Sequence, residues 1–575
     1  MKRSNNPSPS STAKRQRSES ALARPRTCLS FAPGESTVPS LFKSDRPPSN
    51  LLELAALGLG SSRKPSKAYR IPPNFDTDAC DWSNWEQAVE HFTELNLDSD
   101  IDDEEGIILF LQGAASGSSS STLAIRKSRT LAWAMQTPSA AAMNSDFQVP
   151  QSAVDSTTIF DGRPLECTGP DVCCYVPAFY AFKKAVNETD ISIPDDDENI
   201  VHALRLMEAG CAYYDDEALR QLALAKYLVP LCRPVFWCQS FFSDQDVDKK
   251  EICPDASCLV HSVDTQVAAR SFPFLGEFKN EIGEGDSDPE YQAACDYHLF
   301  CQWKTTAVWR ERSCVPSILM GLVGKDIVIN GAIYMNGPIV QRLYRTELQV
   351  HGSDRLAAAK RLVHVFASLT TAVSTLRDFY HSLPSDPIPP YVEPTYTIEG
   401  WALTWEGSPI PSHPRSERMV FYATAKSSTN VAVSAVVKFS QTYSVDAHRK
   451  MEELGAAAPL LHHHFDDVIG RHVVLTKRLD PAEEPLDQGA VQRLRGALEG
   501  YHRAGFVFGD LRAPNIVRDN GALKLVDFDW AGHKGKVRYP KINTQLDWAK
   551  GVASYALILA EHDLAMLDKL SPPPA

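Results

Sequence analysis

Three polar residues near the end of the chain have the types and the spacing that phosphoryl transfer requires. Asp510 and Asn515 lie five positions apart in FVFGDLRAPNIV, and Asp527 follows in KLVDFDWAG. Transfer of a phosphoryl group from ATP to a hydroxyl needs an aspartate that orients and deprotonates the hydroxyl, and hard oxygen ligands that hold Mg²⁺ on the phosphates. We therefore predict Asp510 as the base, and Asn515 and Asp527 as the Mg²⁺ ligands.

The elements expected before this loop supply the remaining parts of such a site. Lys438 ends the apolar run SAVVKF, which predicts a strand, and this lysine would grip the α- and β-phosphates. The helix expected in DAHRKMEEL carries Asp446, Glu452 and Glu453, and one of these carboxylates could fix Lys438. Arg512, in the loop itself, could contact the γ-phosphate or pair with a neighbouring carboxylate. AVQRLRGALEGYHRAG then predicts a helix that leads into the loop.

GDLRAPNIV followed by LVDFDWAG resembles the signature of the protein-kinase-like superfamily, Asp-Leu-x-x-x-x-Asn followed by Asp-Phe-Gly. The GDL form and DFDWAG are similar to its short members, such as the aminoglycoside phosphotransferase-like and fungal-type kinase-like domains. The resemblance covers residues 395–570 and implies a two-lobed kinase-like fold, ATP and Mg²⁺ as cofactors, and a protein as the phosphate acceptor. In that family the spacing from Lys438 favours Glu453 as its partner, whereas Asp446 better fits the residues that follow it.

Several positions depart from the family pattern. Phe508 and Gly509 stand where a histidine and an arginine are usual, and Asp529 replaces the glycine of Asp-Phe-Gly. The segment before Lys438, EGSPIPSHPRSERM, contains one glycine and three prolines, so its backbone could approach a phosphate less closely than a glycine-rich loop. No Ala-Pro-Glu motif follows Asp527. A kinase-like fold without activity, which serves as an interaction scaffold, is therefore an alternative.

A second set of residues, in the middle of the chain, suits metal-dependent hydrolysis. Asp255 lies twenty-two positions before Glu277, and period-two alternation puts Glu277 and Lys279 on the same face of the strand expected in FPFLGEFK. Asp255 and Glu277 could hold Mg²⁺ while Lys279 activates a water against a phosphodiester. An ion pair between Glu277 and Lys279 near a capping aspartate would be the purely structural interpretation.

These residues and the order of the elements around them resemble the PD-(D/E)XK nuclease superfamily. A helix with Gln292 and Tyr297, and then the strand SILMGLVG, follow the Glu-x-Lys strand. The resemblance implies an α/β restriction-endonuclease-like domain in which Gln292 joins Asp255, Glu277 and Lys279, and it makes nucleic acid a candidate partner. The acidic stretch GEGDSDPE just after the strand would repel DNA.

The composition fits an intracellular multidomain protein. The chain has 575 residues, enough for about three or four domains, and its 43% hydrophobic and 23% charged residues are ordinary for globular proteins. A net charge of −14 argues against a protein that binds nucleic acid along its whole length. The 13 cysteines form no disulfide or zinc pattern, and no run of about eighteen apolar residues predicts a membrane span. We expect the cytoplasm or the nucleus, because the basic pairs Lys2–Arg3 and Lys14–Arg15 could form an import signal.

We expect an α+β chain of five parts. The proline-rich PSDPIPPYVEP marks the main boundary, and acidic residues open the helices expected in PDDDENIVHALRLMEAG and DEALRQLALAKYLVPL. The expected activity is ATP-dependent phosphotransfer to protein, and the alternative is a Mg²⁺-dependent nuclease with a regulatory kinase-like domain. The parts are a disordered basic leader (1–75), an undefined segment with a low-complexity insert (76–185), the nuclease-like domain (186–345), a helical connector with the proline-rich linker (346–390) and the kinase-like domain (391–575).

Overall fold

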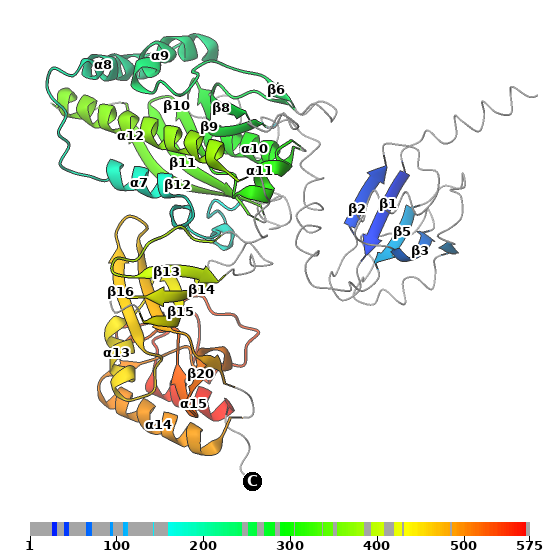
Figure 1. Ribbon diagram of the computed structural model, residues 1–575, viewed down its shortest axis with the longest axis vertical. Coiled ribbons are helices and arrows are strands. Elements are labelled where there is room, and N and C mark those ends of the chain that lie inside the picture. The colour runs from blue at the N-terminus through cyan, green and yellow to red at the C-terminus, as the bar shows by residue number, and fades with distance from the viewer. Residues whose placement is uncertain are drawn as a thin grey trace, which may run out of the picture. The chain divides into compact units, whose positions relative to one another are not determined.

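The structure, a computed structural model, describes five strands near the N-terminus and most residues of the rest of the chain (Figure 1). The chain divides into two compact units, residues 1–135 and 136–575. The described residues are those of strands β1 to β5, positions 138 and 142, and residues 159–570 apart from 244–250, 262–269, 282–287, 304, 336, 349–353, 385–392, 407–418, 428–430 and 483–485.

The first unit contains one five-stranded sheet in the order β2-β1-β5-β3-β4. β1 pairs antiparallel with β2 and parallel with β5, while β3 pairs antiparallel with both β5 and β4. β1, β2 and β3 lie within residues 1–75, for which the composition predicts disorder. Short runs such as RTCLSF contain residues that favour a strand, which accounts for the difference. The other residues of the leader, and the insert SGSSSS, lie outside the described residues. The strands are β1 (Arg26–Phe31), β2 (Ser40–Ser44), β3 (Pro65–Ile71), β4 (Thr93–Leu95) and β5 (Ile107–Gln112).

A five-stranded mixed sheet organises residues 159–384 of the second unit, which we call the middle region. Its order is β12-β11-β10-β9-β8, with β9 and β10 parallel and the other neighbours antiparallel. β9 and β10 are buried on both faces, which explains their nearly continuous apolar sequences. The strands are β8 (Ala256–His261), β9 (Arg270–Lys279), β10 (Ser317–Val323), β11 (Asp326–Tyr334) and β12 (Pro338–Glu347), and a separate ribbon pairs β6 (Phe242–Ser243) with β7 (Glu251–Ile252).

Helices cover this sheet (Figure 1). α10 connects the parallel strands β9 and β10, and it packs so closely that a Cβ at Gly321 would lie 3.1 Å from the backbone nitrogen of Glu290. The two expected helices with acidic starts are confirmed as α8 and α9, which Asp197 and Asp216 cap by accepting backbone N–H groups. The helices are η3 (Leu165–Cys167), η4 (Val172–Cys174), α7 (Pro177–Val186), α8 (Glu198–Gly210), α9 (Glu217–Leu231), α10 (Pro289–Gln302), α11 (Ala307–Arg312) and α12 (Arg355–Ser382).

α12 is an integral part of the middle region, although it lies in the segment expected as a connector. Its side chains Leu362, Phe366 and Leu369 belong to the same hydrophobic core as Phe274 and Ile318 of the sheet. Within the described part of the chain, α12 is the one helix long and apolar enough to cross a membrane. Its packing on the sheet accounts for this apolar length.

Residues 393–570, which we call the C-terminal region, start with a second five-stranded sheet, in which all neighbouring strands are antiparallel. Its order is β13-β14-β15-β17-β16, and α13 follows β15. The later elements build around the long helix α14, and they form a hydrophobic core separate from that of the sheet. The elements are β13 (Ala402–Glu406), β14 (Met419–Lys426), β15 (Ala432–Ser440), α13 (Val445–Glu453), β16 (Leu460–Asp466), β17 (Arg471–Lys477), β18 (Asp480–Pro481), α14 (Gln488–Arg503), β19 (Phe506–Val507), η6 (Ala513–Asn515), β20 (Ile516–Asp519), β21 (Ala522–Leu525), β22 (Gly532–His533) and α15 (Ala560–Leu570).

The sheet of the C-terminal region shares one hydrophobic core with the middle region. Polar contacts reinforce this junction. The hydroxyl of Tyr180 in the middle region donates to Oδ2 of Asp466 at the end of β16, and the same oxygen accepts from the hydroxyl of Tyr396 within the C-terminal region. Arg471 and Asp171, both buried, approach to 3.6 Å across the same junction. The sheet that carries Lys438 is therefore held by the middle region.

We expect Tyr396→Phe to lower the free energy of unfolding of the full chain by about 1.5 kcal/mol or more, because it removes a hydrogen bond to a carboxylate. Urea denaturation measures the change. Tyr213→Phe is the matched control, since Tyr213 is 89% exposed and its change should stay within about 0.5 kcal/mol. Equal effects of the two substitutions would contradict the role assigned to Asp466.

Candidate functional site

Lys438 forms two ion pairs that connect the antiparallel sheet to the turn after β21. Its Nζ lies 2.6 Å from Oδ1 of Asp527 and 2.7 Å from Oδ2 of Asp529. Asp527 has a φ of +72°, a backbone conformation that non-glycine residues rarely adopt and that is found at functional sites. Two of the predicted site residues, Lys438 and Asp527, are thus in direct contact.

The other two predicted residues, Asp510 and Asn515, are also in direct contact. Nδ2 of Asn515 donates to the backbone oxygen and to Oδ2 of Asp510, both at 2.8 Å. The backbone N–H of Val526 donates to the carbonyl oxygen of Asn515 at 3.0 Å. Asp527, the next residue, therefore lies beside the loop that carries Asp510 and Asn515. The structure therefore brings the predicted base, both predicted metal ligands and the lysine into one site.

Arg512 pairs with the predicted base. Its Nε and Nη2 lie 2.5 and 2.8 Å from the two oxygens of Asp510, a bidentate arrangement that raises the pKa of the guanidinium. The guanidinium carbon also lies 5.5 Å from the ring centre of Trp548. Of the two roles that the sequence leaves open for Arg512, the carboxylate pair is the one found in this structure.

A buried carboxylate from α15 holds the loop in place. Asp563, 1% exposed, accepts backbone N–H groups of Phe508 and Gly509 at 2.9 and 2.7 Å, and Nε2 of His502 lies 2.9 Å away. Gly509 has a φ of +88°, and a Cβ there would lie 2.7 Å from Ile558. This position therefore requires glycine, which explains one departure from the family pattern. Asp563 was not among the predicted site residues, and its one signal in the sequence is a pair of polar residues, His562 and Asp563, directly before the apolar run LAML.

The acidic residues of α13 do not reach Lys438. Glu453 is exposed and pairs with Lys450 at 2.8 Å, so the expected pair with Lys438 is absent from the structure. Oε2 of Glu452 accepts the backbone N–H of Leu460 at 3.4 Å. Asp446, in the first turn of the helix, is exposed.

His448 is the α13 side chain that faces the site. Its Nε2 donates to the carbonyl oxygen of Ala458 at 2.7 Å, and its Nδ1 accepts from the hydroxyl of Tyr443. Its ring stacks on the ring of Phe528, with 4.3 Å between the ring centres. Phe528 is the residue between Asp527 and Asp529 in the sequence. Burial lowers the pKa of His448 to about 4, because a charged ring would lose its hydration there.

The low pKa of His448 predicts a pH dependence of stability. Between about pH 6.5 and pH 4 the unfolded chain binds a proton at His448 that the folded chain does not, so the free energy of unfolding falls as the pH falls through this range. The contribution is at most about 3 kcal/mol. We expect His448→Asn to make this fall shallower in urea denaturation at pH 4.5 to 7, whereas the exposed His381→Asn should leave it unchanged. An unchanged slope in His448→Asn would contradict the assignment.

The predicted residues of the middle region also lie together. Oδ2 of Asp255, just before β8, accepts the backbone N–H of Phe278 at 2.8 Å. Oε2 of Glu277 on β9 accepts from Nε2 of Gln292 on α10 at 2.5 Å. Nζ of Lys279 does not pair with Glu277; it lies 3.0 Å from Oε2 of Glu217.

Helices α9 and α10 add acidic residues that the sequence analysis missed. Glu217 on α9 forms an ion pair with Lys279. Asp296 on α10 lies beside Glu277, and each of these two residues is only 1% exposed. Burial raises the pKa of Asp255 to about 6, that of Asp296 to about 7, and that of Glu277 well above its usual range. The side chains of Glu277 and Asp296 are within hydrogen-bonding reach of each other, so a proton on one carboxyl group would bond to the other.

Carboxylate oxygens of this kind suit Mg²⁺, which binds one or two carboxylates and keeps several waters. Across the described ranges, no group of three or more His, Cys, Asp or Glu side chains has the geometry to hold a metal ion. Asp255 and Glu277 supply the oxygen atoms that Mg²⁺ prefers, but both are almost fully buried and have raised pKa values, so a bound Mg²⁺ would have to displace their protons.

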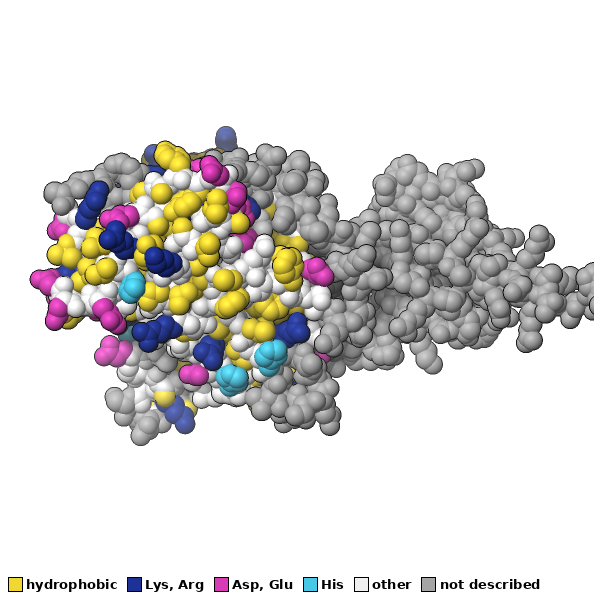
Figure 2. Space-filling model, turned by 90° about the horizontal axis from the view of Figure 1, so that it is seen from above, with side chains coloured by type: hydrophobic (Ala, Val, Ile, Leu, Met, Phe, Trp, Pro, Cys, Tyr) yellow, Lys and Arg dark blue, Asp and Glu magenta, His cyan; other side chains and the backbone are white. Residues whose placement is uncertain are grey.

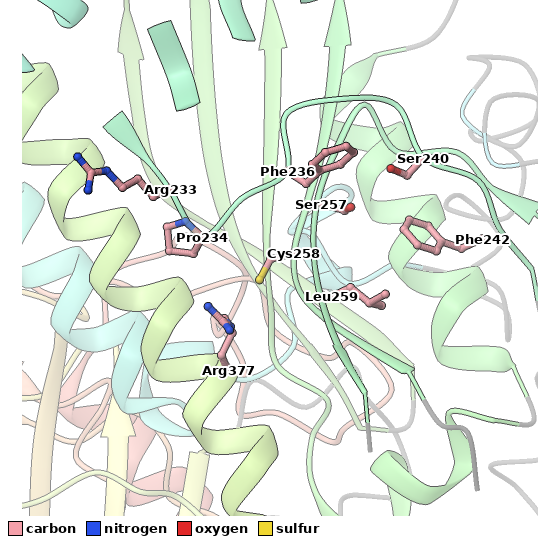
Figure 3. A pocket seen from close by; sticks show the side chains of 9 residues that line it. All are labelled: Arg233, Pro234, Phe236, Ser240, Phe242, Ser257, Cys258, Leu259 and Arg377. Carbon is pink, nitrogen blue, oxygen red and sulfur yellow. The ribbon is translucent and has the colours of Figure 1, made fainter. Parts of the chain in front are cut away.

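A separate pocket of about 380 Å³ lies along the edge strand β8 (Figure 3). Figure 3 shows Arg233 and Arg377 on one side of this strand and Phe242 on the other. None of the residues of either site lines it. The lining residues are Arg233, Pro234, Phe236, Ser240, Phe242, Ser257, Cys258, Leu259 and Arg377.

Hydrophobic side chains are also exposed on the helices of the middle region. Figure 2 shows such side chains intermixed with Lys and Arg on the face seen from above. On α8 and α9 they are Val201, Leu219, Leu222 and Val229.

No protein-family model matches this chain, and no curated protein matches it either. The two candidate sites are therefore defined by the contacts and the chemistry of their own residues.

Proposed function

We propose that the C-terminal region is an ATP- and Mg²⁺-dependent phosphotransferase with a two-lobed kinase-like fold. The observation that carries this proposal is the convergence of Lys438, Asp527, Asn515 and Asp510, which come from separate elements, on one site. An antiparallel sheet with one helix, followed by a helical part with its own core, supports the two-lobed arrangement.

The side chains fit the proposed metal. Asn515 uses its amide nitrogen for both hydrogen bonds to Asp510, which leaves its carbonyl oxygen for a cation. Asp527 supplies a second hard oxygen of the kind that Mg²⁺ prefers. Bound Mg²⁺ would neutralise charge on the phosphates, and Lys438 would hold the α- and β-phosphates.

Asp510 would accept the proton of the acceptor hydroxyl. The hydroxyl oxygen would then form a bond to the γ-phosphorus while the bond from that phosphorus to the ADP oxygen breaks. Arg512, which pairs with Asp510, would have to release at least one carboxylate oxygen for this step. A protein hydroxyl as the acceptor follows from the kinase resemblance, and an intracellular location follows from the composition.

We expect Mg²⁺–ATP to stabilise the full chain in thermal unfolding. A ligand at 100 times its dissociation constant adds about 2.7 kcal/mol. Asp527→Asn should lose this gain, whereas Asp467→Asn, an exposed control, should keep it. Asp510→Asn should keep the gain and lose phosphoryl transfer from γ-labelled ATP to protein, because it removes the base and leaves both metal ligands.

Two results would contradict the proposal. The first is an unsubstituted chain that Mg²⁺–ATP does not stabilise, which would favour an interaction scaffold. The second is equal stabilisation of the Asp527→Asn chain and the control.

A second activity is favoured by the cluster in the middle region. Asp255, Glu277 and Gln292 are buried at this end of β9, and Lys279 beside them pairs with Glu217 of α9. We propose that this group supports Mg²⁺-dependent hydrolysis of a phosphodiester. Asp255 and Glu277 would hold the metal, and Lys279 would orient the attacking water. Nucleic acid as the substrate follows from the nuclease resemblance.

We expect Lys279→Ala to reduce Mg²⁺-dependent cleavage of labelled DNA and RNA oligonucleotides by about 100-fold or more, the usual size of a lost proton-transfer group. Lys325→Ala is the matched control, because Lys325 also forms one ion pair, 2.9 Å from Glu347, away from the cluster. Cleavage that survives Lys279→Ala, or that both substitutions reduce equally, would rule out the assigned role.

A further inference from the structure

We infer that Asp529, rather than a carboxylate of α13, is the positioning residue that holds Lys438 in the phosphotransfer site. The inference rests on the proposed function, because it concerns how that site keeps its phosphate-binding lysine in place. Asp529 stands where the sequence pattern would have a glycine, so its carboxylate is an addition to the site.

The contacts of Asp529 are those of a fixed partner. Oδ2 lies 2.7 Å from Nζ of Lys438. Oγ of Ser440, two residues after the lysine on β15, lies 2.7 Å from the same oxygen and 2.7 Å from the carbonyl oxygen of Thr442, so its one proton is shared between these two acceptors. The Asp529 side chain is 19% exposed, compared with 36% for Asp527. Asp529 is therefore the less exposed of the two carboxylates on Lys438, and it also contacts the hydroxyl of Ser440.

The helix that could compete for this role presents no acid to the lysine. Glu453 pairs with Lys450 on the solvent side, and Glu452 accepts a backbone N–H of the next strand. The buried face of α13 is formed by Ala447, His448 and Met451, and His448 contacts Phe528. The carboxylate that fixes Lys438 thus comes from the turn after β21.

The two aspartates have separable tasks once the nucleotide and metal bind. Asp527 would hold the proposed Mg²⁺, which would weaken its ion pair with Lys438. Asp529 would keep its ion pair and so hold the ammonium in place for the phosphates. Since neither Asp529 nor Ser440 belongs to α13, these contacts of the lysine do not involve that helix.

Binding of ADP to the full chain at saturating Mg²⁺, measured by calorimetry, tests this inference. We expect Asp529→Asn to weaken ADP binding about tenfold or more, the effect of losing a charge-assisted hydrogen bond. Asp529→Glu should recover part of the loss, because it restores the charge. Glu452→Gln and Glu453→Gln, the matched controls on α13, should bind ADP within about twofold of the unsubstituted chain.

Three outcomes would overturn the inference. Asp529→Asn could bind ADP as the unsubstituted chain does, or one of the α13 substitutions could weaken binding as much. A loss in Asp529→Asn that higher Mg²⁺ concentrations reverse would instead identify Asp529 as a metal ligand. If Asp529→Asn does not fold, Ser440→Ala replaces it, with a smaller loss of ADP binding expected and unchanged binding as the contrary result. A failure of the unsubstituted chain to bind ADP would count against the proposed function itself.

Discussion

The ammonium group of Lys438 is the charge on which the geometry of the C-terminal region depends. It belongs to the sheet, whereas Asp527 and Asp529 belong to the turn after β21, so the two ion pairs connect two separate hydrophobic cores. A largely buried ammonium needs such partners, because without them its lost hydration is not offset. Two carboxylates on one lysine leave a net negative charge, and a bound cation would neutralise it.

The sequence predicts the loop of this site well, because Asp510 and Asn515 are neighbours in the chain. It does not predict Asp563, which holds the same loop from a distant helix. The partner expected for Lys438 shows a different limit. The rotation of α13 is set by burial of residues spaced three or four apart, and this places His448 and Met451 inward and Glu453 in solvent. Charge spacing along the sequence carries no information about that rotation.

In the middle region the strand pattern places Glu277 correctly, because alternation along one strand is a local property. The pairing of Lys279 with Glu217 depends on how α9 packs on the sheet, which one sequence does not reveal. Asp296 was more accessible to prediction. It lies one helical turn after Gln292, and residues four apart share a helix face, so a comparison of the faces of α10 would have found it.

The two halves of the proposed phosphotransfer site belong to different hydrophobic cores. The sheet that carries Lys438 shares its core with the middle region, and Tyr180 of the middle region donates a hydrogen bond to Asp466 of the sheet. The loop with Asp510 belongs to the other core, together with α14 and α15. Because Lys438 lies on the sheet while Asp527 and Asp529 lie in the turn after β21, their ion pairs oppose a separation of these two cores. The role inferred for Asp529 requires the two cores to stay in contact at the Lys438–Asp529 pair when a nucleotide binds.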